Sequence, residues 1–186
     1  MAVLNEETCA VGNYIEFGNY HGNKLNWKVL AKDGNRRLLF LDKPVDYMCF
    51  YPERVNSEWA MCTLRRWLNK DFLEQSFTLQ ERMSILLSMH RNNVDPRWYL
   101  ENGPDTKDKA FVFNIFELDE FVPDIKDRAV GEWWWLRGHG CSNLNQHAVY
   151  YDGTVYMEGV SCDAHEVGVR PAMWIKINPI RKTTVL

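Results

Sequence analysis

The sequence predicts a single α+β domain of 186 residues. In the first and last thirds, apolar and polar residues alternate as in half-buried strands, and each third contains an Asp-Gly pair typical of a hairpin turn, at Asp33-Gly34 and Asp152-Gly153. Between these regions, apolar residues recur at the three- and four-residue spacing of an amphipathic helix. Helices that lie between two groups of strands indicate the α+β class. With 46% hydrophobic and 25% charged residues, the chain can bury a core.

The N-terminal part is predicted to form a β-hairpin preceded by one strand. Residues 12–18 alternate in polarity, and two further runs, 25–31 and 37–41, flank the turn at Asp33-Gly34.

Two helices are predicted next. The first covers most of 60–74, because its apolar residues fall on one helical face: Leu64, Trp67, Leu68 and Phe72. Thr78 followed by Glu81 has the spacing of a capping box and begins a second, shorter helix through Met83 or beyond.

The middle of the chain contains a long segment rich in turn residues. Residues 91–109 hold so many Asn, Asp, Pro and Gly that we expect no regular element there, only a long excursion over the surface. The apolar run 110–116 has the composition of a buried strand, and 117–121 can form one helical turn before Pro123.

The last third is predicted to be a C-terminal group of antiparallel strands. These strands cover 132–137, then 148–151 and 154–157 around the Asp152-Gly153 turn, and finally 167–177.

The charge balance argues against polyanionic partners. Lys plus Arg number 22 against 25 Asp plus Glu, a net charge of -3, so we expect neither nucleic-acid binding nor attraction to an anionic membrane. The start, MAVLNEETCAVG, does not resemble a signal peptide, and no apolar run has the ~18 residues of a membrane span. We therefore expect synthesis in the cytoplasm and no direct insertion into a membrane.

The cysteines indicate neither a disulfide framework nor a zinc ribbon. Their number is odd and no CxxC spacing occurs, so at least one thiol stays free or pairs between chains. They are Cys9, Cys49, Cys62, Cys141 and Cys162.

Five motifs in a fixed order carry a family resemblance across residues 14–176. They are IEFG (15–18), WKVL (27–30), LRRWLN (64–69), WWLR (134–137) and GVRPAMWI (168–175). The chain resembles a bacterial and phage domain family of unknown function, which is itself similar to the C-type lectin fold. That branch of the fold includes formylglycine-generating enzymes and the variable proteins of diversity-generating retroelements, such as the phage major tropism determinant. After WWLR, the family's usual Ser-Pro-Gly is replaced here by Gly138-His139-Gly140.

The two C-terminal motifs are expected to be scaffold. Trp67, Trp134 and Trp174 should be buried, and Arg137 and Arg170 should each hold a loop carbonyl or a carboxylate in place, because a partly buried guanidinium must satisfy its five donors.

The segment between these motifs, 138–165, has the composition of a binding surface. It holds three of the five His, two of the five Cys and three of the eight Tyr, and no Lys or Arg. Tyr with Ser and Asn is the mixture that antibody loops use, although a turn-rich segment also collects these residue types without binding anything. The candidate ligand-binding residues are His139, Cys141, Ser142, Asn143, Asn145, His147, Tyr150, Tyr151, Asp152, Tyr156, Ser161, Cys162, Asp163 and His165.

The resemblance and this composition together predict a ligand-binding protein without catalytic activity or cofactor. Variable residues of retroelement-diversified proteins lie between such scaffold strands near the C-terminus. We expect display on a virion or a cell surface, where the partner is a protein or another cell-surface ligand; the oligomeric state is left open.

Two other functions are considered. An enzyme related to formylglycine-generating enzymes would need a cysteine pair, and Cys141 and Cys162, 21 residues apart, do not match that family's closely spaced pair. Alternatively, His139, Cys141, His147, Cys162 and His165 are residue types that bind transition metals, although their spacing matches no specific site.

Overall fold

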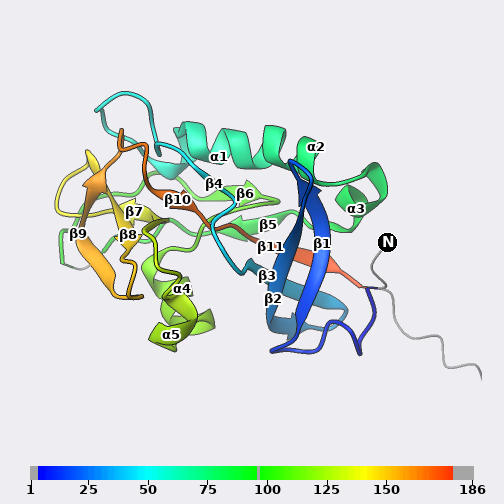
Figure 1. Cartoon of the computed structure of the whole chain (residues 1–186). Helices are drawn as coiled ribbons and strands as arrows, with labels where there is room; N and C mark the ends of the chain where they lie inside the picture. Colours follow the sequence, from blue (N-terminus) through cyan, green and yellow to red (C-terminus); the bar gives the residue numbers. More distant parts are fainter. Residues whose placement is uncertain (1–3, 96, 178–186) are drawn as a thin grey trace, which may run out of the picture.

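Two main β-sheets form the two ends of the molecule in the computed structural model, which describes residues 4–95 and 97–177 (Figure 1). The chain is thus of the α+β class, as predicted. The first sheet has the order β1-β2-β3-β11 and contains Tyr14–Tyr20, Asn23–Asp33, Arg36–Leu41 and Ala172–Lys176. The second has the order β4-β10-β7-β8-β9 and contains Asp46–Tyr47, Gly168–Val169, Trp134–His139, Asn145–Val149 and Val155–Ser161. A two-stranded ribbon pairs β5 (Ser88–His90) with β6 (Thr106–Asp108).

The N-terminal hairpin forms where the sequence predicts it. Strands β2 and β3 meet with Asp33 opposite Arg36, and the Gly34 turn lies between them. Alternate side chains of β2 point into the core, among them the fully buried Trp27, whose indole nitrogen donates to the carbonyl of Phe17 at 2.7 Å. This alternation is the period-2 pattern expected for a sheet with one buried face.

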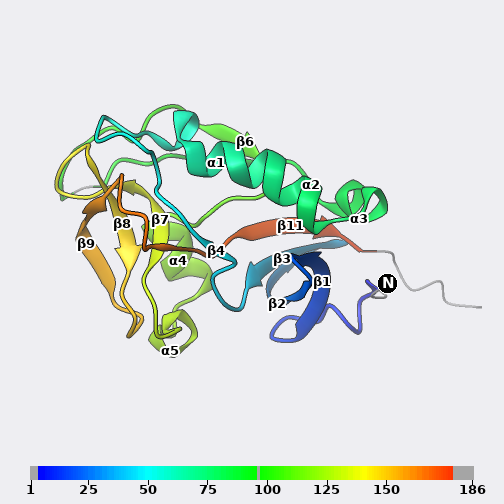
Figure 2. The ribbon, with the colours of Figure 1, turned by 45° about the horizontal axis from the view of Figure 1, so that its top comes forward.

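The predicted first helix is a continuous helical stretch with a π-helical turn in its middle. It consists of α1 (Thr63–Trp67), η2 (Leu68–Phe72) and α2 (Leu73–Ser76), preceded by a 3-10 turn, η1 (Trp59–Met61). The predicted capping box is present at the start of α3 (Leu79–Ser84), where Thr78 and Glu81 bond reciprocally. Figure 2 shows α1 and α2 running above β11.

The apolar run 110–116 does not form the predicted strand. Residues Ala110 to Phe113 are buried but irregular, with one isolated bridge from Phe111 to Ala172. The Asn69 side chain accepts from the backbone of Ala110 and donates to its carbonyl, so a side chain replaces a strand partner. A helix, α4 (Ile115–Phe121), starts earlier than predicted and has its own capping box; α5 (Ile125–Arg128) follows.

The segment 91–109 is more than a surface excursion. Its end contributes strand β6, and the side chains of Asp95, Asn102 and Asp108 are buried. Asn102 accepts a hydrogen bond from the backbone of His139, so the segment packs on the β7–β8 pair.

The predicted strand 167–177 is divided between the two sheets. β10 pairs with β7 in parallel, which departs from the all-antiparallel prediction, and β11 pairs with β3. Pro171, which has no N–H to donate to a sheet, lies at the crossover. The Arg170 guanidinium holds this point by donating to the carbonyls of Leu41 at 2.7 Å and Asp127 at 3.1 Å, as expected for a scaffold arginine.

The tryptophans differ in depth. Trp134 is fully buried, as predicted, whereas Trp67 and Trp174 are only partly buried and pack at the margin of the core. Trp174 lies under the Arg36 guanidinium, 4.9 Å from the ring centroid. Within the part of the chain that the structure describes, no helix is long and apolar enough to cross a membrane.

Candidate functional site

The β8–β9 hairpin separates the candidate residues into two groups. Val149 pairs with Val155 beside the turn, and Asn145 pairs with Ser161 at the opposite end. At ~3.3 Å per residue, strand β8 places these ends ~13 Å apart. The sequence segment 138–165 is therefore not one surface but two, a turn end and a loop end.

The turn end carries a group of contacting aromatic side chains, here called the aromatic cluster: Trp133, Tyr150, Tyr151 and Tyr156. Trp133 meets Tyr150 edge-on with ring centroids 4.2 Å apart, and Tyr156 lies 5.0 Å from Tyr150. Tyr151 is 59% exposed, and the other three are partly buried. Such a cluster combines apolar area with hydroxyl groups at the surface.

The turn beneath the cluster is rigidly built. The Asp152 carboxylate accepts from the backbone and the hydroxyl of Thr154, at 3.0 and 2.7 Å, and these bonds lower its pKa. Gly153 has a φ of 89° and packs on α5, where a Cβ atom would lie 2.9 Å from the backbone nitrogen of Ala129. Only glycine suits this position, so the turn is fixed against the domain.

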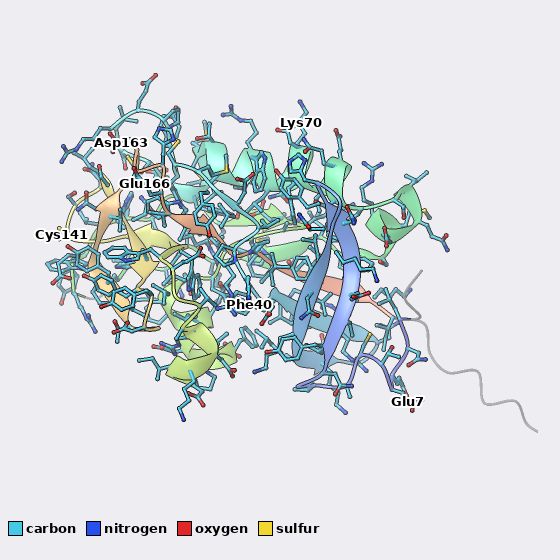
Figure 3. The ribbon with its side chains drawn as sticks, in the orientation of Figure 1. Glu7, Phe40, Lys70, Cys141, Asp163 and Glu166 are labelled. Atoms are coloured by element: carbon cyan, nitrogen blue, oxygen red, sulfur yellow. The ribbon has the colours of Figure 1, made fainter. Side chains whose placement is uncertain are left out.

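The loop end is polar, and many of its side chains bond internally. Ser161 donates to Asp163 at 2.5 Å, and the Asn145 amide donates to the carbonyl of Gly159 at 3.3 Å. Figure 3 shows Cys141 and Asp163 on this side of the molecule. The remaining members are Ser142, Asn143 and His165, of which Asn143 and His165 are exposed, as is Cys141.

Gly140 brings β7 close to β9 at this end. A Cβ atom on Gly140 would lie 2.8 Å from the backbone nitrogen of Gly159, closer than real Cβ atoms come. The glycine thus permits the close approach that sets the shape of the β7–β8 loop.

Three predicted site residues are buried and cannot contact a partner at the surface: His139, His147 and Cys162. Gln146, from β8, donates to the backbone and hydroxyl oxygens of Ser57 and contacts His139 Nδ1 at 2.9 Å. Burial lowers the pKa of both histidines, that of His147 to about 4, so both rings are neutral at pH 7. They belong to the interior between β7–β8 and the segment 91–105.

His147 faces one carboxylate in this interior. Its Nε2 lies 3.4 Å from Asp95 Oδ2, and Asp95 Oδ1 accepts from the backbone of Arg97 at 2.7 Å. The contact joins β8 to the segment 91–105 that covers it.

The residues proposed as metal ligands do not gather. Within residues 4–95 and 97–177, no group of three or more His, Cys, Asp or Glu is arranged to hold a metal ion. The cysteines of the enzyme hypothesis also differ in access, since Cys141 is exposed and Cys162 is buried with its thiol toward the carbonyls of Glu53 and Val55.

Sequence reasoning missed Trp133 as a member of the site. It directly precedes strand β7, and strand alternation would place it on the same face as Trp135, which is fully buried. No local pattern in the sequence therefore marked Trp133 as a surface residue.

Comparison with curated proteins gives no match, and neither does comparison with solved structures. A family model, described as a domain of unknown function (DUF6273), matches residues 35–177. This range covers three of the five motifs and both ends of the candidate site. The chain belongs to the DUF6273 family.

Proposed function

We propose that this chain is a ligand-binding module with a C-type-lectin-like fold, and that its aromatic cluster contacts a protein or another cell-surface ligand. The observation that carries the proposal is the cluster itself. Four aromatic side chains, one strongly exposed, form a connected group beside a turn that packs on α5. The fold assignment is supported by the five ordered motifs through which the chain resembles families of that fold, and it agrees with the α+β class of the structure.

The cluster has the physical properties of a recognition surface. Tyrosine and tryptophan offer large contact areas and lose little conformational entropy, because each has two side-chain torsions. The rings of Tyr150 and Tyr156 already restrict each other, so fixing them in a complex costs less conformational entropy than fixing two free side chains would. Partial desolvation and the nearby Tyr156 and Glu158 raise the pKa of Tyr150, so its hydroxyl remains a neutral donor at pH 7.

Replacing Tyr150, Tyr151 and Tyr156 together by alanine is expected to abolish ligand binding and to leave the melting temperature nearly unchanged. The ligand is first selected with the unaltered protein from a panel of purified envelope proteins and polysaccharides. Tyr14→Ala is the control, since Tyr14 is 51% exposed on the other sheet. If the triple variant melts as early as a Trp134→Ala variant, the tyrosines are core residues and the proposal fails.

The proposed function includes diversification by a retroelement, with display on a virion or a cell surface. In such systems, substitutions arise at template adenines, and an AAC codon altered at its first two bases cannot encode Gln, Glu, Lys, Met or Trp. Exposed residues such as Asn143, Tyr151 and His165 belong to the permitted set and can change without disturbing the core.

Sequencing this gene in sibling isolates tests whether the chain is diversified by a retroelement. Differences should concentrate at the exposed and partly exposed candidates, while Gln146, Met157, Glu158 and Glu166 stay fixed. We also expect His139, His147 and Cys162 to stay fixed, although their residue types belong to the permitted set, because they are buried. Differences spread evenly along the chain, or concentrated at 91–109, would contradict targeted diversification.

A further inference from the structure

A groove of about 530 Å³ lies between the helical stretch α1–η2 and the β5–β6 ribbon. Figure 3 labels Lys70 on this helical side, away from Cys141 at the end of the second sheet. The groove shares no lining residue with the aromatic cluster or the loop end. It is therefore a separate feature of the surface.

The ribbon and its flanks contribute Leu87 and three consecutive residues, Lys107, Asp108 and Lys109, to the lining of the groove. Met89 pairs with Lys107 and Ser88 pairs with Asp108, so side chains on the two strands alternate together. Ser88 and Asp108 point inward and are buried, whereas Met89 and Lys107 are exposed. By the same alternation, Leu87 and Lys109 lie on the outer side beside Met89 and Lys107, and both line the groove.

The groove has a strong local excess of positive charge. Its lining contains five basic side chains and one acid, Asp108, which is buried and already bonded to Arg65 at 2.7 Å and to the indole of Trp59 at 3.0 Å. The remaining four basic side chains have no carboxylate partner within the described part of the chain: Arg66, Lys70, Lys107 and Lys109. This excess occurs in a protein whose net charge is -3.

Exposed apolar side chains lie among these cations. Met61 is 69% exposed and Leu87 is 60% exposed, and both line the groove. A free phosphate or a sugar would leave them uncovered, whereas a peptide with alternating acidic and apolar side chains would neutralise the cations and cover both. Methionine adapts its shape to such partners.

We infer that this groove binds an acidic segment of a partner protein that carries apolar side chains between its carboxylates. The unpaired cations accelerate and orient the encounter, and Met61 and Leu87 supply the area removed from water.

A labelled peptide of alternating Glu and Leu is the probe, and fluorescence anisotropy is the measurement. The full chain should bind this peptide, and Lys107→Glu/Lys109→Glu should weaken binding by about tenfold or more, since charge reversal turns attraction into repulsion. Lys32→Glu/Lys176→Glu, on the first sheet, changes the net charge equally and should leave the affinity nearly unchanged. Thermal melting of both variants confirms that each is folded.

Two comparisons separate the peptide from other anions. A Glu-Ser peptide should bind more weakly than the Glu-Leu peptide, and Met61→Ser/Leu87→Ser should remove that difference. The inference is overturned if the Glu-Leu peptide does not bind, if both charge variants weaken it equally, or if the Glu-Ser peptide binds as well. Tighter binding of a single-stranded oligonucleotide than of the peptide would also overturn it in favour of a nucleic-acid site.

Discussion

Replacing Trp134 by alanine is expected to lower the free energy of unfolding by about 3–5 kcal/mol. Trp134 is fully buried and packs on Phe40, with ring centroids 5.7 Å apart. Its indole nitrogen donates to the carbonyl of Arg128 at 3.1 Å, and the Arg170 guanidinium lies 5.1 Å from its ring centroid. The substitution therefore leaves a cavity and removes the shorter of two hydrogen bonds to the Arg128 carbonyl, which keeps only the 3.4 Å bond from Arg170. It also removes one of the two rings beside the Arg170 guanidinium, the other being Phe40.

Urea unfolding followed by far-UV circular dichroism measures this effect. Trp174→Ala is the matched control: it removes the same side chain from the other C-terminal motif, but Trp174 is only partly buried. We expect Trp174→Ala to lower the free energy of unfolding by less, because it removes chiefly the packing of Trp174 against Arg36. If Trp134→Ala lowers the free energy of unfolding no more than Trp174→Ala does, Trp134 does not lie at the centre of the core.

Local signals in the sequence predicted local structure well. The Asp33-Gly34 and Asp152-Gly153 turns and the Thr78–Glu81 capping box each depend on residues within four positions of one another, and all are present. Such elements follow from backbone conformation and nearby hydrogen bonds, which a short stretch of sequence contains.

Elements that depend on distant partners could not be predicted in this way. The run 110–113 has a strand's composition, but only Phe111 pairs with a strand, at Ala172, and other backbone groups bond to Asn69 and Arg137. The run 167–177 has the composition of one uninterrupted strand, yet it forms two: β10 pairs with β7, and β11 pairs with β3. In both cases, the decisive contacts are tens of residues away in the chain.

The same reason limits prediction of the site. Composition identified the β8–β9 region, and the tyrosines of the aromatic cluster are among its candidates. It could not show that His139 and His147 lie beneath the segment 91–105, because histidine occurs both at surfaces and in interiors. Burial here depends on Asn102 and Ser57, which come from other parts of the chain.

The motif arginine Arg137 joins these separate segments. It is 1% exposed and holds the Glu117 carboxylate with two parallel bonds of 2.5 and 2.6 Å. It also donates to the carbonyl of Val112 at 2.6 Å and to the amide oxygen of Asn92 at 3.2 Å. One side chain thus fixes α4, the irregular core segment and the start of the segment 91–105, which packs over the buried His139 and His147.

Replacing Glu117 by glutamine is expected to lower the free energy of unfolding at pH 7 by about 3–5 kcal/mol, because Arg137 then remains charged and buried without its partner. Burial alone would raise the pKa of Glu117, but the charge of Arg137 and the bonds from His90 and Arg137 outweigh it and lower the pKa to about 2. The unfolded carboxyl, with a pKa of 4.5, binds protons first as the pH falls. The stabilisation, about 3 kcal/mol for this shift, is therefore complete above pH ~5 and is lost as the pH falls toward 2.

Urea unfolding at a series of pH values between 7 and ~3 measures both effects. The free energy of unfolding of the unaltered protein should fall steeply below pH ~5. Glu117→Gln should be less stable at pH 7, and its free energy of unfolding should depend less on pH between 7 and ~3. Glu16→Gln, which breaks the exposed pair with Lys24, is the control and should change little. The double variant Glu117→Leu/Arg137→Met should recover much of the loss at pH 7, because both buried charges are removed together. Equal stability of Glu117→Gln and the unaltered protein at pH 7, or parallel pH profiles, would show that the pair does not hold these segments together.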